Sequence, residues 1–124
     1  MVRLDTHVVV WLAQGDLDKL SDLAVEHIEA SEVTVSPMVE LELTYLHEIG
    51  RVSKPGAEVM GWLRHSMGVS LSTVPLAELV SQAHLVSWTR DPFDRLIASD
   101  ALVASEPLLT KDQQILDHLD LAVW

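Results

Sequence analysis

The 124-residue sequence contains no cysteine, which excludes disulfide bonds and cysteine-based zinc sites. It also lacks any run of about 18 apolar residues, the length that a membrane-spanning helix needs. Asp5 and His7 interrupt the apolar start of the chain, so we expect no signal peptide. Repeats, low-complexity stretches and linker-like segments are absent as well. We therefore expect one domain over residues 1–124, in the cytoplasm.

Basic residues are scarce. Eight Lys and Arg stand against 19 Asp and Glu, which gives a net charge of −11. Proteins that bind nucleic acid through phosphate contacts need cations, at least on one face. Tight, unassisted binding of RNA is therefore disfavoured, unless divalent metal ions neutralise part of the charge. Arg90 and Arg95 are the candidates for direct phosphate contacts.

Short apolar, β-branched runs alternate with helical patterns along the chain. Five strands are expected at residues 2–4, 33–35, 69–74, 108–110 and 121–123. Helices are expected at about 6–13, 22–29, 36–50, 55–65, 75–86, 91–105 and 113–118, several of them with a capping residue or a proline at the start. This alternation predicts an α/β fold with a parallel sheet covered on both faces. In such sheets, ligands bind beyond the carboxyl ends of the strands.

Glu42 has an unexpected position on a helical wheel of residues 38–49. The apolar residues of this segment form one broad arc: Met38, Val39, Leu41, Leu43, Tyr45, Leu46 and Ile49. Glu42 falls within roughly 10° of the centre of the arc, whereas Glu40 points almost directly away and is expected in solvent. Because burying an unpaired carboxylate costs several kcal/mol, Glu42 is a candidate functional residue. Pairing with a buried arginine or local bending of the helix is the alternative.

Other acids stand where expected strands end or helices begin. Asp5 follows the first strand and Asp112 follows the fourth, although each is also suited to cap the helix after it. Asp91 precedes Pro92 and is interpreted mainly as a helix N-cap. Asp94 lies on the flank of that helix's apolar stripe and is the better candidate for a ligand.

These acids are predicted to converge on one edge of the sheet. Carboxylate oxygens are hard ligands that suit Mg²⁺ or Mn²⁺. A cluster of this kind supports phosphodiester hydrolysis without a protein nucleophile. The histidines show no paired metal-ligand spacing, and neither a glycine-rich phosphate loop nor a Gly-x-Ser-x-Gly elbow is present. The four tryptophans are interpreted as core or interface residues rather than as base-stacking platforms.

Four blocks of the sequence together resemble PIN domains, particularly the VapC toxins. They are LDTHVVVWL at 4–12, VSPMVELELTYLHEIGR at 35–51, RDPFDRLIASDALV at 90–103 and LLTKDQQI at 108–115. The blocks occur in the order found in that family and span almost the entire chain. The resemblance implies a three-layer α/β/α sandwich with a five-stranded parallel sheet, and Mg²⁺- or Mn²⁺-dependent endoribonuclease activity.

The resemblance also implies a set of site residues. Catalytic and metal-binding roles fall to Asp5, Glu42, Asp94 and Asp112. Auxiliary candidates are Thr6, Asp91, Thr110 and Asp100. Asp100 departs from the pattern of similar sequences, so it either adds a charge near the site or lies at a dimer surface.

VapC toxins act on RNA, form homodimers and are silenced by an antitoxin, so the resemblance implies these partners too. A basic antitoxin segment would complement a net charge of −11. Two alternatives remain open at this point. One is a PIN nuclease of housekeeping RNA processing without an antitoxin, and the other is a PIN-like binding module without catalysis. An upstream antitoxin reading frame would identify the toxin, and metal-dependent cleavage would exclude the binding module.

Overall fold

The computed structural model describes residues 1–124 and contains one five-stranded sheet in the order β3-β2-β1-β4-β5. Its strands are β1 (Val2–Leu4), β2 (Val33–Val35), β3 (Ser70–Leu71), β4 (Leu108–Leu109) and β5 (Ala122–Val123). All four pairs of neighbouring strands are parallel. The predicted α/β class and five-stranded parallel sheet are thus confirmed.

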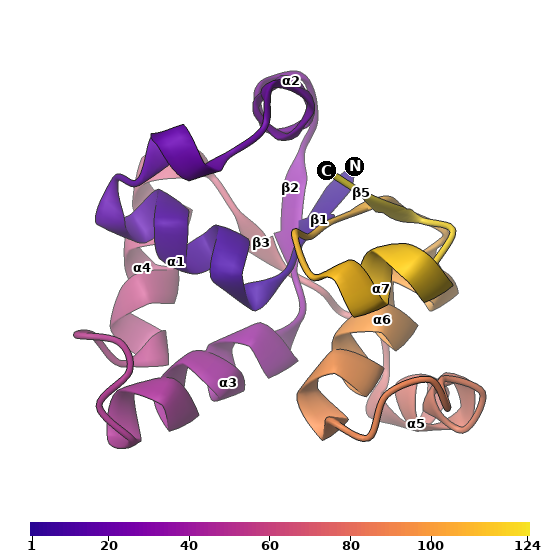
Figure 1. The fold of residues 1–124 in the computed structure, drawn as a ribbon. Coiled ribbons are helices and arrows are strands. Elements are labelled where there is room, and N and C mark those ends of the chain that lie inside the picture. The colour runs from indigo at the N-terminus through magenta and orange to yellow at the C-terminus, as the bar shows by residue number, and fades with distance from the viewer.

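Helices cover both faces of this sheet. They are α1 (Thr6–Gln14), α2 (Asp22–Ala30), α3 (Pro37–Glu48), α4 (Gly56–Met67), α5 (Leu76–Ala83), α6 (Pro92–Ala104) and α7 (Gln113–His118), with a 3₁₀ turn η1 (Leu17–Lys19) after α1. Figure 1 shows α1 and α4 on one side of the strands and α5, α6 and α7 on the other, which is the expected α/β/α sandwich. No helix has the length and apolar character needed to cross a membrane.

Helix starts follow from local hydrogen bonding. The Ser36 hydroxyl accepts the backbone N–H of Met38 at 3.1 Å, and Pro37 occupies the first turn of α3 without losing a bond. Gly56 is the first residue of α4 and lies where this helix crosses α3. No larger residue fits there, because a Cβ at that position would lie 2.1 Å from the Glu40 carbonyl oxygen. The glycine therefore sets how closely α3 and α4 approach.

The third strand is shorter than predicted. The expected strand at 69–74 was wrong beyond Leu71, although the Ser72 N–H still donates to the Val35 carbonyl at 2.8 Å. The Ser72 hydroxyl accepts the N–H of Val74 and donates to Asp100, so the chain turns away from the sheet there. The turn η1 was not predicted either, because three residues are too few to show a helical period.

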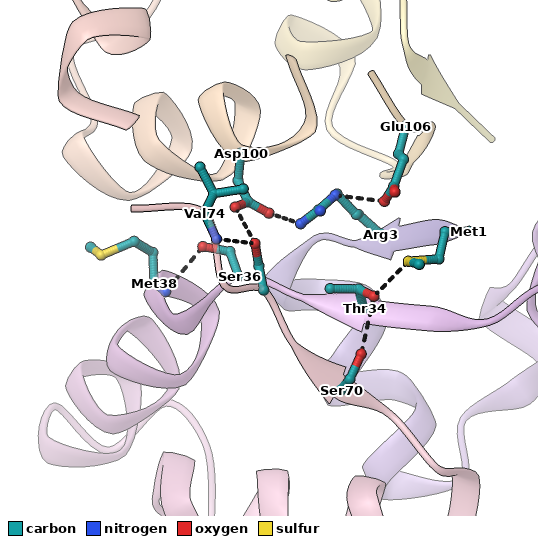
Figure 2. A network of polar contacts seen from close by, with 10 residues as sticks. Met1, Arg3, Thr34, Ser36, Met38, Ser70, Val74, Asp100 and Glu106 are labelled. Carbon is teal, nitrogen blue, oxygen red and sulfur yellow. Dashed lines mark hydrogen bonds and ion pairs between the residues drawn. The ribbon is translucent and has the colours of Figure 1, made fainter. Parts of the chain in front are cut away.

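A buried polar group joins the first strand to α6. Arg3 on β1 donates to Asp100 and, through Nε, to Glu106 at 3.0 Å, and Figure 2 shows its guanidinium between the two carboxylates. The Ser72 hydroxyl donates to the second oxygen of Asp100 at 2.6 Å. Arg3 is only 6% exposed and Asp100 only 1%. We call Arg3, Ser72, Asp100 and Glu106 the Arg3 cluster.

Candidate metal centre

Several acids lie at the carboxyl end of β1, where the order of the strands reverses direction. The strand order runs from β1 through β2 to β3 in one direction and through β4 to β5 in the other. Asp5 follows β1, and its N–H donates to the Leu109 carbonyl at the end of β4 at 3.0 Å. Such a switch point is where open parallel sheets bind ligands. We call Asp5, Glu42, Asp91, Asp94 and Asp112 the acid edge.

Asp5 is held rigidly and is only 4% exposed. One carboxylate oxygen accepts the N–H of Thr6 at 2.8 Å, and the other accepts the hydroxyl of Thr110 at 2.7 Å. The side chain therefore caps α1, as the alternative interpretation held, and also faces the other acids. Burial raises the pKa of Asp5 and the charge of Asp112 raises it further, against the opposing bonds from Thr110 and Thr6.

Glu42 reaches the same place from α3. Its carboxylate accepts a short hydrogen bond from the Thr6 hydroxyl. Burial is the main cause that raises the pKa of Glu42; the Thr6 bond opposes it, and the charges of Asp5 and Asp91 add to it. Thr6, which was an auxiliary candidate, thus orients the glutamate from the residue after Asp5.

The helical wheel was only partly right about the surroundings of Glu42. Val39 and Leu43 are buried, but Leu41 and Tyr45 on the other side of the arc are 53% and 48% exposed. Glu42 therefore lies half-buried at the boundary of the core rather than at its centre. It takes part in none of the four ion pairs of the structure, so pairing with a buried arginine does not occur. Glu40 is also half-buried, where solvent was expected.

Asp91 and Asp94 belong to the start of α6. One oxygen of Asp91 accepts the N–H groups of Phe93 at 2.8 Å and Asp94 at 3.2 Å, so the predicted N-cap is present. Yet Glu42, Asp91 and Asp94 each place one carboxylate oxygen within 4.8 Å of the others. The cap is thus also a member of the acid group. The sequence pointed mainly to a capping role for Asp91, because an aspartate before a proline at a helix start is already explained as an N-cap.

Asp94 shows that all five acids interact. Its pKa rises from the usual 3.8 to about 7, first through burial and then through the charges of the four other acids of the acid edge. No hydrogen bond to its carboxylate opposes the shift. In the metal-free protein, the acid edge therefore carries more negative charge than the neighbouring residues stabilise.

Thr110 links the last two acids. Its buried hydroxyl donates to Asp5 and accepts the N–H of Asp112 at 3.0 Å. Asp112 is exposed and caps α7 by accepting the N–H groups of Gln114 and Ile115. Like Asp5, this acid serves as a helix cap and lies beside the other carboxylates.

No cation of the protein forms an ion pair with the acid edge, although the charge of nearby His7 lowers the pKa of Asp5 and of Glu42. None of its members takes part in an ion pair. Arg95 donates through Nε to the Thr89 carbonyl at 2.9 Å, and Arg90 is exposed. Asp100 does not join the acid edge but belongs to the Arg3 cluster. An all-oxygen set of carboxylates that forms no ion pair within the chain fits a hard divalent ion.

Comparisons with known proteins bear on the family and on the fold. A model of the PIN domain matches residues 2–120 of the chain. Ribonuclease VapC22 of Mycobacterium tuberculosis is 31% identical over 121 residues, which cover 94% of this chain and 91% of the relative. VapBC2 of Rickettsia felis, solved bound to a DNA fragment from the promoter, superposes with a TM-score of 0.68 over 99% of this chain and 96% of that chain. At 16% identity, the latter match concerns the fold alone.

Proposed function

This chain belongs to the PIN-domain family, and from that premise we propose that it is a metal-dependent endoribonuclease of the VapC toxin type. One observation carries the proposal: Glu42, Asp91 and Asp94 place carboxylate oxygens within 4.8 Å of one another at the switch point of the sheet, and no member of the acid edge forms an ion pair. Asp5 and Asp112 lie near enough for their charges to raise the pKa of Asp94. The proposed reaction, cleavage of RNA, follows from the 31% identical relative, which is named as a ribonuclease.

The proposed metal ligands are Asp5, Glu42, Asp94 and Asp112, with Mg²⁺ or Mn²⁺ as the ion. When bound, a divalent ion lowers the pKa of water and screens the charge that develops on the phosphate. The protein's part is to hold the carboxylates in place. Thr6 orients Glu42, and this bond leaves the rest of the Glu42 carboxylate for the ion. Asp94 must lose its proton before it can bind.

The proposed substrate is RNA, and the proposed partners are a second copy of the chain and a cognate antitoxin. Exposed apolar side chains on α3 and α5 and just after each helix support protein partners, because a partner would cover apolar surface that is now in contact with water. They are Leu41, Tyr45, Ile49, Leu76, Val80 and Leu85. A net charge of −11 favours an antitoxin with a basic segment.

The test is cleavage of single-stranded RNA by the purified chain with Mg²⁺, with Mn²⁺, and with a chelator. We expect cleavage with either ion and none with the chelator. Glu42→Gln should abolish cleavage, and Glu40→Gln, the matched control on the same helix, should retain it.

Two results would contradict the proposal. The first is a folded wild-type protein that binds RNA but does not cut it with either ion, as a non-catalytic PIN-like module would behave. The second is loss of cleavage in Glu40→Gln together with full activity in Glu42→Gln, which would show that the acid edge is not the site.

A further inference from the structure

An open pocket of about 300 Å³ lies next to the acid edge. It is lined by Asp5, His7, Trp11, Lys111 and Asp112. Two of these residues are proposed metal ligands, so a group bound in the pocket would lie directly beside the reacting phosphate. The other three residues are Trp11, His7 and Lys111: the charge of His7 acts on Asp5 and Glu42, but nothing in the metal site accounts for the tryptophan or the lysine.

Trp11 offers a fixed aromatic surface in this pocket. Its ring packs at 5.8 Å from the ring of Trp124, and the His7 ring lies 6.2 Å away. The tryptophan is half-buried, so the core holds the ring while part of it faces the pocket. Rings held in this way stack with nucleobases in proteins that bind single-stranded nucleic acid.

The pocket also contains a basic residue in a chain that has few. The Lys111 ammonium lies over the Trp11 ring, 6.0 Å from its centre, and takes part in none of the ion pairs. The Lys111 side chain is exposed and unbranched, so it can move off the ring when a base stacks there. Lys19 lies equally close to the ring, but it pairs with Asp16 at 3.5 Å. Lys111 is therefore the basic side chain in the pocket that is free to meet a phosphate.

The other tryptophans do not share this arrangement. Trp88 stacks on His118 at 5.4 Å with the rings almost parallel, so the stacking face is already covered. Trp62 is 44% exposed and lines an apolar groove that contains none of the acids of the acid edge. Trp11, which packs against the core as the sequence-based interpretation of the tryptophans has it, differs from Trp62 and Trp88 in also lining a pocket beside the acid edge.

We infer that the Trp11 pocket binds a nucleobase of single-stranded RNA next to the cut phosphate, with the base stacked on Trp11 and an adjacent phosphate on Lys111. This inference rests on the proposed ribonuclease function. It makes Trp11 and Lys111 determinants of substrate binding, while the acids of the acid edge perform the chemistry. It also explains how so acidic a chain could hold RNA, since stacking on a ring needs no positive charge.

The test uses Trp11→Leu, Trp11→Phe and the control Trp62→Leu, each confirmed as folded by its thermal melt. Stacking on an aromatic ring corresponds to about a 5- to 150-fold change in binding per base. We expect Trp11→Leu to raise KM for single-stranded RNA by that factor with kcat little changed, because stacking acts on bound substrate and transition state alike. Trp11→Phe should recover most of the loss, and Trp62→Leu should match the wild type.

Direct binding of RNA gives a second readout without cleavage. Asp94→Asn protein is titrated with a labelled single-stranded RNA, with and without Trp11→Leu, at several salt concentrations. Lys111→Gln in the same background should lower the slope of log affinity against log salt by about 0.7, the value for one phosphate contact on a single strand. This variant changes an exposed side chain, so it serves even if Trp11→Leu does not fold.

The outcomes separate the pocket from the function. Wild-type protein that cuts no RNA overturns both proposals. Wild-type protein that cuts RNA while Trp11→Leu and Lys111→Gln behave like Trp62→Leu overturns the pocket alone. A fall in kcat without a change in KM in Trp11→Leu would show that the ring only supports Asp5, which also contradicts the inference.

Discussion

Two groups of carboxylates approach the interior of this protein, and α6 contributes to both. At the acid edge, Asp94 meets the other acids without a cation. In the Arg3 cluster, Asp100, which lies further along the same helix, meets the guanidinium of Arg3 and the hydroxyl of Ser72. Burial raises the pKa of Asp100 too, but there Ser72 and Arg3 oppose the shift.

The difference separates structural acids from functional ones. A buried carboxylate with a structural role needs a counter-ion within the chain, because an unpaired buried charge lowers the free energy of unfolding. A carboxylate that serves a metal site must be left without one, so that an external ion can bind. The acid edge thus pays in stability of the metal-free protein for its capacity to bind an ion.

Removing the cation of the Arg3 cluster should have the largest effect. Arg3→Met leaves Asp100 and Glu106 without compensation, and breaking a buried pair in this way costs about 3–5 kcal/mol. Urea unfolding of the metal-free protein measures the loss. Lys19→Met, which breaks the exposed pair with Asp16, is the control and should cost at most about 1 kcal/mol. Equal losses in the two variants would show that the Arg3 cluster is no more than a surface contact.

Neutralising one acid in each group should separate activity from stability. Asp94→Asn should reduce metal-dependent RNA cleavage by at least about 100-fold, the upper range for residues that merely support metal ligands. Asp100→Asn should lower the free energy of unfolding but leave cleavage intact at temperatures where the variant is folded. Full activity in Asp94→Asn, or a folded Asp100→Asn without activity, would remove the distinction between the two groups.

The pH dependence of metal-free protein should reveal the uncompensated group. The pKa of Asp94 is about 7 in the folded state against 3.8 ordinarily, so folded protein binds a proton that the unfolded chain has released. Stability from this group is complete below about pH 4 and is lost as the pH rises through 7. Asp94→Asn should flatten this part of the profile of melting temperature against pH.

Metal should reverse that loss. Mg²⁺ or Mn²⁺ at about 100 times its Kd should stabilise the protein by about 2.7 kcal/mol at pH 8. The gain should be smaller at pH 5, where Asp94 holds its proton and must release it to bind. The same rise in melting temperature at both values, measured by calorimetry on protein freed of metal, would argue against Asp94 as a ligand.

Most of the fold could be predicted from the sequence because it depends on local patterns. The β-branched triplet Val33–Val35 and the Ser36-Pro37 start of α3 are strong signals, and the structure has both as predicted. The end of β3 could not be predicted, because Ser72 turns toward Asp100, a residue 28 positions away. No sequence pattern near Ser72 indicates that contact.

Some features of the candidate site could likewise be predicted from the sequence and others could not. Asp5 and Asp112 could be placed beside each other because parallel strands bring their carboxyl ends to one edge. That Asp91 joins the acids, and that Asp100 pairs with Arg3 instead, could not be predicted from spacing. Both depend on how α3 and α6 pack against the sheet. A helical wheel likewise cannot tell an apolar face that meets the core from one left exposed, as at Tyr45.

The smallest predicted effect concerns Asp91, which caps α6 and adds charge to the acid edge. Asp91→Ala removes a cap and should cost about 1 kcal/mol, whereas Asp91→Asn still accepts the Phe93 N–H and should recover most of that. Ser21→Ala, which removes the cap of α2 far from the acids in sequence, is the control and should cost about as much. Only the Asp91 variants should also weaken the pH dependence of metal-free stability, because the Asp91 charge helps raise the pKa of Asp94. If Ser21→Ala weakens that pH dependence as much, the effect is general loss of stability, and Asp91 is a helix cap with no share in the acid edge.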